Sequence, residues 1–218
     1  YFRSNRWVHG VLWGSPTLVQ ARTNTLSVSN SILGNGTWLL GNQTFPAGYN
    51  VVWGVAPRSD IASFTALQDV GWGWSNCVYA DPLFANATNG DFHLRSPAGR
   101  YDTNLADFVT TDTNYSFAID FGDPAASVSN EPAPNGSRLN AGLFGGTAQA
   151  SKSRTNAWIQ LASFRDGGTL DAQAGAWVRW NAGQYDGGAT ITIWLSRDNG
   201  KSWEAIATNV PASAGHFF

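Results

Sequence analysis

Charged side chains are scarce in this sequence of 218 residues. They make up 13 % of the chain, against roughly 25 % in ordinary soluble domains, whereas the hydrophobic fraction of 43 % is close to normal. Asn, Thr, Ser and Gly cover the surface instead. With 11 Trp and many Gly-containing turns, this balance indicates an all-β extracellular protein. The net charge of −2 excludes the basic footprint of a protein that binds nucleic acid or an anionic membrane.

Cysteine and long apolar runs are also missing. Cys77 is the only cysteine, so the chain can form no internal disulfide, and its core and hydrogen-bonded ladders must hold the fold. We expect Cys77 to be a small buried apolar residue. The longest apolar runs are far shorter than a bilayer span, so we expect no membrane span. No secretion signal is present, and the abrupt start and finish of the sequence indicate a fragment of a longer chain.

Carboxylates are absent from the first quarter of the chain, and lysine is rare throughout. No Asp or Glu occurs between Tyr1 and Ser59, and the lysines are Lys152 and Lys201. A calcium cage requires clustered carboxylates, which this segment cannot supply. We therefore expect no metal site and no cofactor.

The sequence does contain a repeat. Three short apolar segments recur at a spacing of twenty residues, at 9–14 (HGVLWG), 29–34 (SNSILG) and 49–54 (YNVVWG). A fixed period near twenty residues is typical of a stacked, quasi-one-dimensional architecture. Asn76 begins a fourth copy lengthened to 26 residues, and residues 62–68 within the extra length resemble a short helix. The sequence pattern of leucine-rich repeats does not recur, so we predict a parallel β-helix.

Aligning the copies assigns a direction to each position. Strand alternation predicts that an aliphatic column points inward and that the next column, which contains two Trp, points outward. Glycines follow at a common turn, and Asn residues two positions before the aliphatic column are predicted to form a ladder between copies. The inward column is Leu12, Ile32 and Val52; the outward column is Trp13, Leu33 and Trp53; the turn is Gly14, Gly34 and Gly54; the ladder is Asn30, Asn50 and Asn76.

A series of motifs runs along the chain: 11–14 (VLWG), 26–33 (LSVSNSIL), 80–84 (ADPLF), 89–94 (NGDFHL), 96–101 (SPAGRY), 118–124 (AIDFGDP) and 131–147 (EPAPNGSRLNAGLFGGT). This series resembles the last coils of secreted bacterial right-handed parallel β-helix proteins of the pectate-lyase-like superfold, over about residues 6 to 153. The resemblance implies terminal coils and a C-terminal cap over residues 1–147. It implies structural turns at Asp81, Pro82, Asp120, Asp123 and Pro124. It implies little about function, because this superfold hosts lyases, hydrolases and adhesins.

The pattern changes after Thr147. Residues 148–155 form a linker of small and basic residues, and from Ala157 the chain alternates in short strands with a hairpin turn at 198–200. Such strands, separated by Gly-rich turns, indicate a β-sandwich over residues 156–218. The segments 175–180 (GAWVRW) and 191–203 (ITIWLSRDNGKSW) resemble the immunoglobulin-like module of the yeast Kre9/Knh1-like family. That resemblance implies a further strand, so we expect a truncated sandwich with an exposed edge.

We predict no catalytic residue in this chain. Polysaccharide lyases on a β-helix need a Lys or Arg base and a cation beside the uronate carboxylate, and we read Arg3, Arg6 and Arg22 as solvated. A glycoside hydrolase needs two carboxylates about 5 to 9.5 Å apart, but the later aspartates occupy terminal turns, where Asp commonly closes the turn. His9 and His93 lack partners for nucleophilic or metal chemistry and are read as structural or solvent-facing.

Two classes of function remain open. The first is the non-catalytic C-terminal portion of a secreted or cell-surface β-helix protein that recognises polysaccharide or presents a surface. The second is part of a polysaccharide-degrading enzyme, a lyase in preference to a hydrolase, whose catalytic coils lie upstream of residue 1. We expect a monomer that binds neither nucleic acid nor a membrane, and no activity in this fragment.

The outward column of Trp13, Leu33 and Trp53 is the candidate for carbohydrate binding. With coils about 4.8 Å apart, its two indoles would stand about 10 Å apart as a platform for sugar rings. The alternative is that the Ala56–Trp74 insertion or another loop buries this column. Burial is favoured because large exposed apolar patches are uncommon on soluble proteins.

Overall fold

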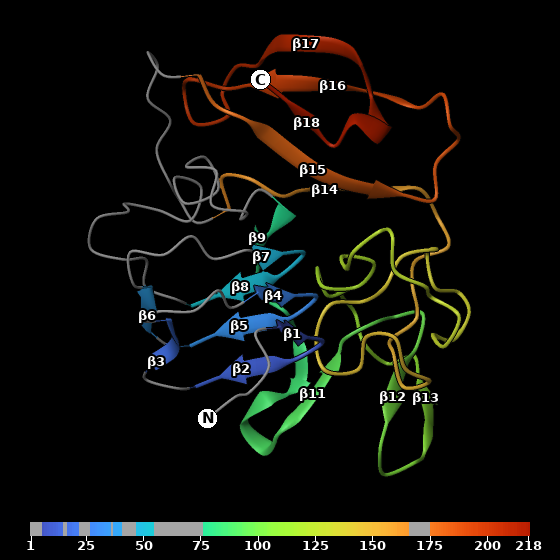
Figure 1. Ribbon diagram of the computed structural model, residues 1–218. Helices are drawn as coiled ribbons and strands as arrows, with labels where there is room; N and C mark the ends of the chain where they lie inside the picture. The colour runs from blue at the N-terminus through green and yellow to red at the C-terminus, as the bar shows by residue number, and fades with distance from the viewer. Residues whose placement is uncertain are drawn as a thin grey trace.

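The computed structural model describes residues 6–14, 17–21, 27–35, 37–40, 47–54, 76–165 and 175–218. These residues form several small β-sheets with only short 3-10 helices beside them, so the predicted all-β class is confirmed (Figure 1). Within this part of the chain, no helix is long and apolar enough to cross a membrane. The insertion 56–74, with the helix expected at 62–68, lies outside the described residues, as do Arg3 and Arg22.

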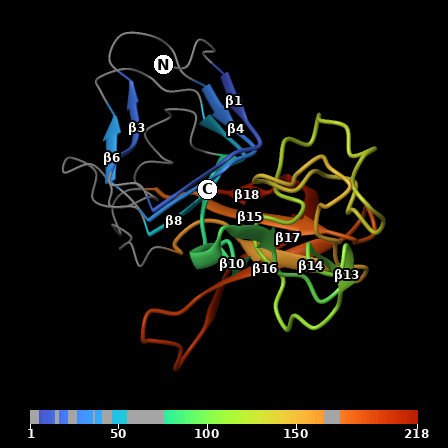
Figure 2. The same cartoon turned by 90° about the horizontal axis from the view of Figure 1, so that it is seen from below.

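The N-terminal third is built from strands that recur in the same order and pair in parallel (Figures 1 and 2). We call each successive set, β1–β2–β3, β4–β5–β6 and β7–β8, a coil. The strands of equivalent position stack into three sheets. The first sheet is β1 (Arg6–Val8), β4 (Ser27–Ser29) and β7 (Ala47–Gly48); the second is β2 (Val11–Trp13), β5 (Ile32–Gly34), β8 (Val51–Trp53) and β9 (Val78–Tyr79); the third is β3 (Thr17–Ala21) and β6 (Thr37–Leu40).

The register of the second sheet corrects the predicted columns by one residue in the middle coil. Ile32 pairs with Val11 and Val51, so the spacing is 21 and then 19 residues instead of twenty twice. Leu33 consequently pairs with Leu12 and Val52. The predicted inward column of Leu12, Ile32 and Val52 is therefore wrong at Ile32, because strand alternation turns Ile32 to the opposite face.

The corners between strands explain this shift. The residue three positions after Val11 is Gly14 (φ +70°), and Gly54 (φ +60°) is its counterpart after Val51. In the middle coil Asn35 (φ +53°) takes this left-handed position, which Asn tolerates better than most residues. Gly34 lies one residue earlier, inside β5. The predicted turn column is therefore wrong at Gly34, whose absent side chain leaves room for the Trp13 ring; a Cβ there would overlap that ring.

The predicted Asn ladder is replaced by a mixed polar column. Asn50 is fully buried; its Oδ1 accepts from the Ser31 amide at 3.0 Å and its Nδ2 donates to the Val28 carbonyl at 2.9 Å. Ser31, not Asn30, is the equivalent residue in the preceding coil, and its Oγ accepts from the Gly10 amide at 3.1 Å. Asn50 also lies 3.6 Å from Cys77 Sγ. The column runs through these residues because every buried backbone N–H needs a partner.

The two other predicted ladder residues have different roles. The Oδ1 of Asn30 leaves the coil stack and accepts from the backbone amide of Asp123 at 2.8 Å. Asn76 is exposed. Asn30 thus fastens the coils to the segment that follows them.

The middle of the chain packs against the outward face of β5, β8 and β9. Ile32, Val51 and Val78 form one buried cluster with Phe84 and Phe117. Most of the segment between residues 110 and 157 consists of turns. The strands of the middle of the chain precede that segment and form two hairpins, with the short helix η2 in the first. The elements are β10 (Phe84–Asn86), η2 (Ala87–Asn89), β11 (Asp91–Leu94), β12 (Arg100–Asp102) and β13 (Asp107–Val109).

The residues implied as structural turns make specific contacts in this segment. Asp81 Oδ1 accepts from the Leu83 amide at 2.8 Å, and Asp123 Oδ1 accepts from the Ala125 amide at 2.9 Å. The carbonyl of the buried Pro82 accepts from Ser116 Oγ at 2.5 Å. Asp120 has a left-handed backbone (φ +57°). Side-chain acceptors of this kind satisfy the backbone amides that a strand or helix would otherwise pair.

The C-terminal part consists of an antiparallel sheet with an antiparallel hairpin above it in Figure 1. Trp180 of the sheet is buried, and its Nε1 donates to the Ala212 carbonyl at 2.8 Å. The hairpin turn contains Asn199 (φ +58°) and Gly200 (φ +86°), within the predicted 198–200 segment. The sheet is β14 (Trp158–Leu161), β15 (Val178–Gly183) and β18 (His216–Phe217); the hairpin is β16 (Thr190–Leu195) and β17 (Glu204–Pro211), followed by η3 (Ala212–Ala214).

Candidate functional site

The predicted outward column of Trp13, Leu33 and Trp53 does not form. Leu33 is fully buried and pairs with Leu12, so it lies on the other face of the sheet from the two indoles. Trp13 is half-buried and packs edge to face on Phe84 of β10, with ring centroids 5.0 Å apart. Trp53 contacts Tyr79 of β9 at 5.2 Å. A segment that follows the coils therefore packs on the indole of Trp13. The three residues of the outward column provide no continuous platform for sugar rings.

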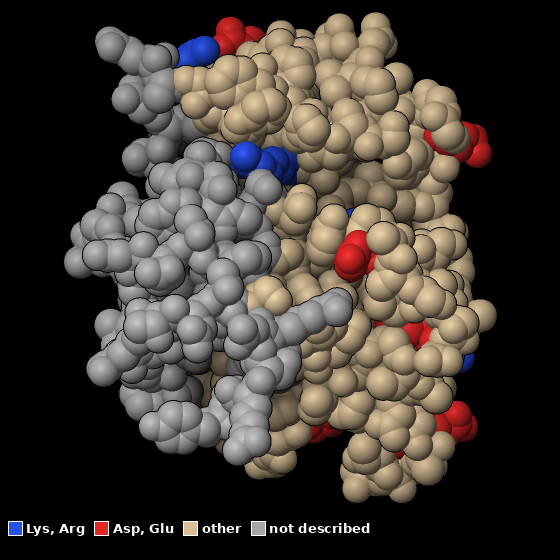
Figure 3. Space-filling model, viewed as in Figure 1, with Lys and Arg blue, Asp and Glu red and all other residues tan. Residues whose placement is uncertain are grey.

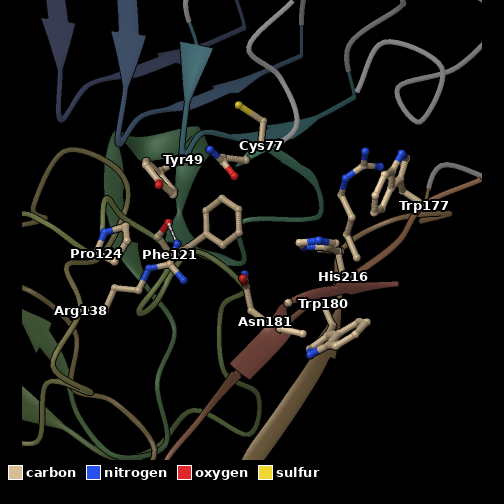
Figure 4. A pocket seen from close by; sticks show the side chains of 14 residues that line it. Tyr49, Cys77, Phe121, Pro124, Arg138, Trp177, Trp180, Asn181 and His216 are labelled. Atoms are coloured by element: carbon tan, nitrogen blue, oxygen red, sulfur yellow. Dashed lines mark hydrogen bonds between the residues drawn. The ribbon is translucent and has the colours of Figure 1, made fainter. Parts of the chain in front are cut away.

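A cavity of about 450 Å³ lies elsewhere, where three distant parts of the chain meet. One wall comes from the last coils, one from the segment between Phe121 and Arg138, and one from β15 and β18 (Figure 4). Its volume is within the range of small-molecule sites. The lining residues are Tyr49, Asn76, Cys77, Phe121, Pro124, Arg138, Ala162, Trp177, Arg179, Trp180, Asn181, Ala214, Gly215 and His216.

Arg138 is fixed on the first side of this cavity. Its Nε donates to the Gly122 carbonyl at 2.5 Å and its Nη2 to the Phe121 carbonyl at 3.1 Å. Its guanidinium carbon lies 5.4 Å from the centre of the Tyr49 ring and 5.5 Å from that of Phe121, which is within cation–π range. These contacts hold the guanidinium in one place, beside the two rings in Figure 4.

The opposite side is one face of the C-terminal sheet. Trp177, Arg179 and Asn181 alternate along the chain and therefore project to the same side. His216 of β18 is paired with Arg179 across the sheet. The Trp177 ring lies 5.1 Å from the His216 ring and 5.8 Å from the Arg179 guanidinium carbon. Figure 4 shows Trp177, His216 and Asn181 across the cavity from Tyr49 and Arg138.

Among the described lining residues, the charged side chains are arginines. Two arginines line the cavity, and no Asp or Glu is among its described lining residues. Burial lowers the pKa of Arg138, while Tyr49, Asp120 and Asp123 raise it, and an arginine stays protonated under such influences. Figure 3 shows few charged side chains on this face of the molecule, with basic side chains just below the C-terminal strands.

The described lining of the cavity offers groups that can bind a ligand. Burial raises the pKa of the Cys77 thiol to about 12, so it is not an available nucleophile. General acid–base catalysis of glycoside hydrolysis needs paired carboxyl groups, which the described lining does not contain. Aromatic rings, an amide and guanidinium groups can instead stack on a polar ligand and donate hydrogen bonds to it.

Two buried acids outside the cavity lining accept hydrogen bonds from the turns of the middle segment. Glu131 Oε1 accepts from the amides of Asn140 at 2.9 Å and Gly146 at 2.8 Å. Asp120 Oδ1 accepts from Ser153 Oγ at 2.6 Å. Burial raises the pKa of Asp120 to about 6 and that of Glu131 to about 7. Neither residue lines the cavity.

The two histidines that the sequence singled out lie outside the described lining of the cavity. His93 is buried, stacks on Phe144 at 3.6 Å and pairs through Nδ1 with Asp91 at 2.7 Å. His9 lies at a left-handed corner (φ +54°), and burial lowers its pKa.

Sequence reasoning did not single out Arg138, Arg179, Asn181 or His216. One local signal existed: the alternation of 177, 179 and 181 places these side chains on one face of a strand. Nothing local indicates that this face meets Tyr49, because the contact joins segments more than a hundred residues apart.

Comparison with protein-family models, curated proteins and solved structures finds no match to this chain.

Proposed function

We propose that residues 1–147 are the terminal coils and C-terminal cap of a right-handed parallel β-helix. Residues 148–155 are the linker, and residues 156–218 a partial immunoglobulin-like β-sandwich. Three stacks of parallel strands support the first assignment, because a chain that winds through the same strand positions in each coil produces such stacks. The antiparallel sheet and hairpin support the second. The low charge supports an extracellular or cell-surface location.

We propose that this part of the protein recognises polysaccharide without acting on it. The observation that carries this proposal is the cavity of about 450 Å³, in which Tyr49, Phe121 and Trp177 supply aromatic rings beside the N–H groups of Arg138 and Asn181. Sugars combine apolar ring faces with hydroxyl groups, and they are bound by aromatic stacking together with planar hydrogen-bond donors. The described lining contains no carboxylate pair to cleave a glycosidic bond.

Affinity electrophoresis in gels that contain neutral and acidic polysaccharides tests this function. We expect at least one polysaccharide to retard the protein, and Trp177→Ala to reduce the retardation about tenfold, because the indole faces the cavity. Trp194→Ala is the matched control, since Trp194 is 55 % exposed and lies outside the cavity. Migration unaffected by every polysaccharide, or equal retardation of both variants, would refute the assignment.

A further inference from the structure

Asn is followed directly by Gly at residues 35–36, 89–90, 135–136 and 199–200. In such a pair the backbone nitrogen of Gly can attack the side-chain carbon of Asn and expel ammonia, because no Cβ on the second residue hinders the approach. In a folded protein the reaction depends on how free that nitrogen is and on the groups around the side-chain amide. Gly36 lies outside the described residues, so the other three pairs can be compared.

The hydrogen bonds of the Gly amides distinguish these three pairs. The Gly90 amide donates to the Ala87 carbonyl at 3.2 Å, and the Gly200 amide donates to Ser196 Oγ at 2.7 Å. The Gly136 amide, in contrast, has no acceptor among the described residues. An amide that is already bonded must give up that bond before its nitrogen can attack, so Gly136 offers the most available nucleophile of the three.

The side-chain amide of Asn135 is held by two hydrogen bonds. Its Oδ1 accepts from the Ser137 amide at 3.3 Å, and its Nδ2 donates to the Glu131 carbonyl at 3.3 Å. A side chain that bonds to the amide two residues further on closes over the residue between them, which here is Gly136. The Ser137 amide also donates to the oxygen on which negative charge develops during the attack, as a donor of an oxyanion hole does.

A carboxyl group packs directly against Gly136. The backbone of Gly136 is left-handed (φ +58°), and a Cβ there would overlap the carboxyl of Asp120. Asp120 is buried, and burial raises its pKa to about 6, against the lowering effect of the Ser153 hydrogen bond and of two nearby arginines. A carboxylate with a raised pKa is a stronger base than an ordinary aspartate. It can accept the proton that the Gly136 nitrogen loses.

We propose that Asn135 is a site of self-catalysed deamidation. The Gly136 nitrogen forms a bond to Cγ of Asn135 while its proton passes to the Asp120 carboxylate. The bond between Cγ and Nδ2 then breaks, and the leaving nitrogen takes the proton from Asp120 and departs as ammonia. The product is a five-membered succinimide, which water opens at either carbonyl to give aspartate or isoaspartate at this position. This modification is independent of the proposed polysaccharide recognition.

Peptide mapping by mass spectrometry tests the site. The protein is incubated at neutral pH, once folded and once in guanidinium chloride, and the deamidated fraction is followed at Asn89, Asn135 and Asn199. Dividing each folded rate by the rate of the same residue in denaturant removes the influence of local sequence. We expect this ratio to be about tenfold or more higher at Asn135 than at the other two residues, whose neighbouring Gly amides are bonded. A ratio at Asn135 equal to or below either of the others would overturn the proposal.

The products test the route. Because a succinimide can open at either carbonyl, we expect the modified peptides to contain both aspartate and isoaspartate at position 135, separated by chromatography. Aspartate alone would mean that water hydrolyses the side-chain amide directly, and it would contradict attack by Gly136.

Asp120→Asn tests the proposed base. The variant keeps an acceptor for Ser153 Oγ but has no carboxylate, so the folded rate at Asn135 should fall about tenfold and the rate at Asn199 should not change. Asp186→Asn, at an exposed position, is the control. An unchanged rate at Asn135 in folded Asp120→Asn would overturn the role of Asp120. If urea denaturation shows that this variant does not fold, the ratios measured on the unaltered protein still decide the proposal.

Discussion

The buried carboxyl of Glu131 makes the stability of this protein depend on pH in a direction opposite to that of most acidic residues. Its Oε1 accepts two backbone N–H groups, from Asn140 and Gly146, and its Oε2 is buried without a hydrogen-bond partner in the described structure. Burial raises the pKa of this carboxyl to about 7 from 4.5, and the neighbouring charge of Asp120 raises it further. The folded protein therefore holds a proton that the unfolded chain releases near pH 4.5.

The sign and size follow from this difference in pKa. A raised pKa contributes stability that is fully present below pH 4.5 and is lost as the pH rises through about 7. One pKa unit is worth about 1.4 kcal/mol, so the full difference corresponds to about 3 kcal/mol, of which roughly 2 to 3 kcal/mol is lost between pH 5 and pH 8. Asp120, whose pKa burial raises to about 6, adds to the loss in the same direction.

Glu131→Gln removes the titration and keeps the Oε1 acceptor. Between pH 5 and pH 8, titration of Glu131 should lower the free energy of unfolding of the wild type by roughly 2 to 3 kcal/mol. We expect this variant not to show that loss. The absolute stability at pH 5 can be lower, since a buried amide N–H₂ replaces Oε2. The measurement is urea denaturation followed by tryptophan fluorescence at pH 5, 6, 7 and 8.

The control for this experiment is Glu204→Gln. Glu204 forms an exposed ion pair with Arg197, so its replacement should leave the pH dependence unchanged. Parallel stability curves for wild type and Glu131→Gln would refute the reasoning, because they would mean that Glu131 titrates alike in the folded and unfolded states.

Two further substitutions test the coil register. Gly34→Ala should destabilise the protein by about 1 to 3 kcal/mol, because the new Cβ overlaps the indole of Trp13 in the preceding coil. Gly187→Ala is the control and should cost far less, because no atom lies near its Cβ. Equal urea midpoints for the two variants would contradict the observed pairing. Asn50→Ala should cost about 2 to 5 kcal/mol in the same assay, because it leaves one buried amide and one buried carbonyl unpaired. Asn76→Ala, at an exposed residue, should be neutral, and a comparable loss there would restore the predicted ladder.

The strands of the coils could be predicted from the sequence, but their register could not. The three apolar segments do form β2, β5 and β8, because short aliphatic runs bounded by turn residues favour strands. An exact period of twenty aligns Gly34 with the corner glycines. The structure instead places Asn35 at that corner, and a shift of one residue exchanges the two faces of β5.

The candidate site was beyond prediction for a different reason. The Trp residues at 13 and 53 stand out in the sequence because they repeat, yet packing on Phe84 and Tyr79 occupies their rings. Arg138 and Arg179 show no repeat, and they gain their role only when the C-terminal sheet lies against the segment after the coils. The alternation of residues along a strand predicts which face of the sheet a side chain lies on. It does not predict which distant segment packs against that face.

The sequence by itself determined the all-β class, the recurrence of short strands and the scarcity of carboxylates in the coils, because strand formation and composition depend on residues near one another in the chain. Tertiary structure alone decided the register of the middle coil and the residues of the polar column. It also brought two arginines into one cavity, because these features depend on contacts between side chains 20 to more than 100 residues apart.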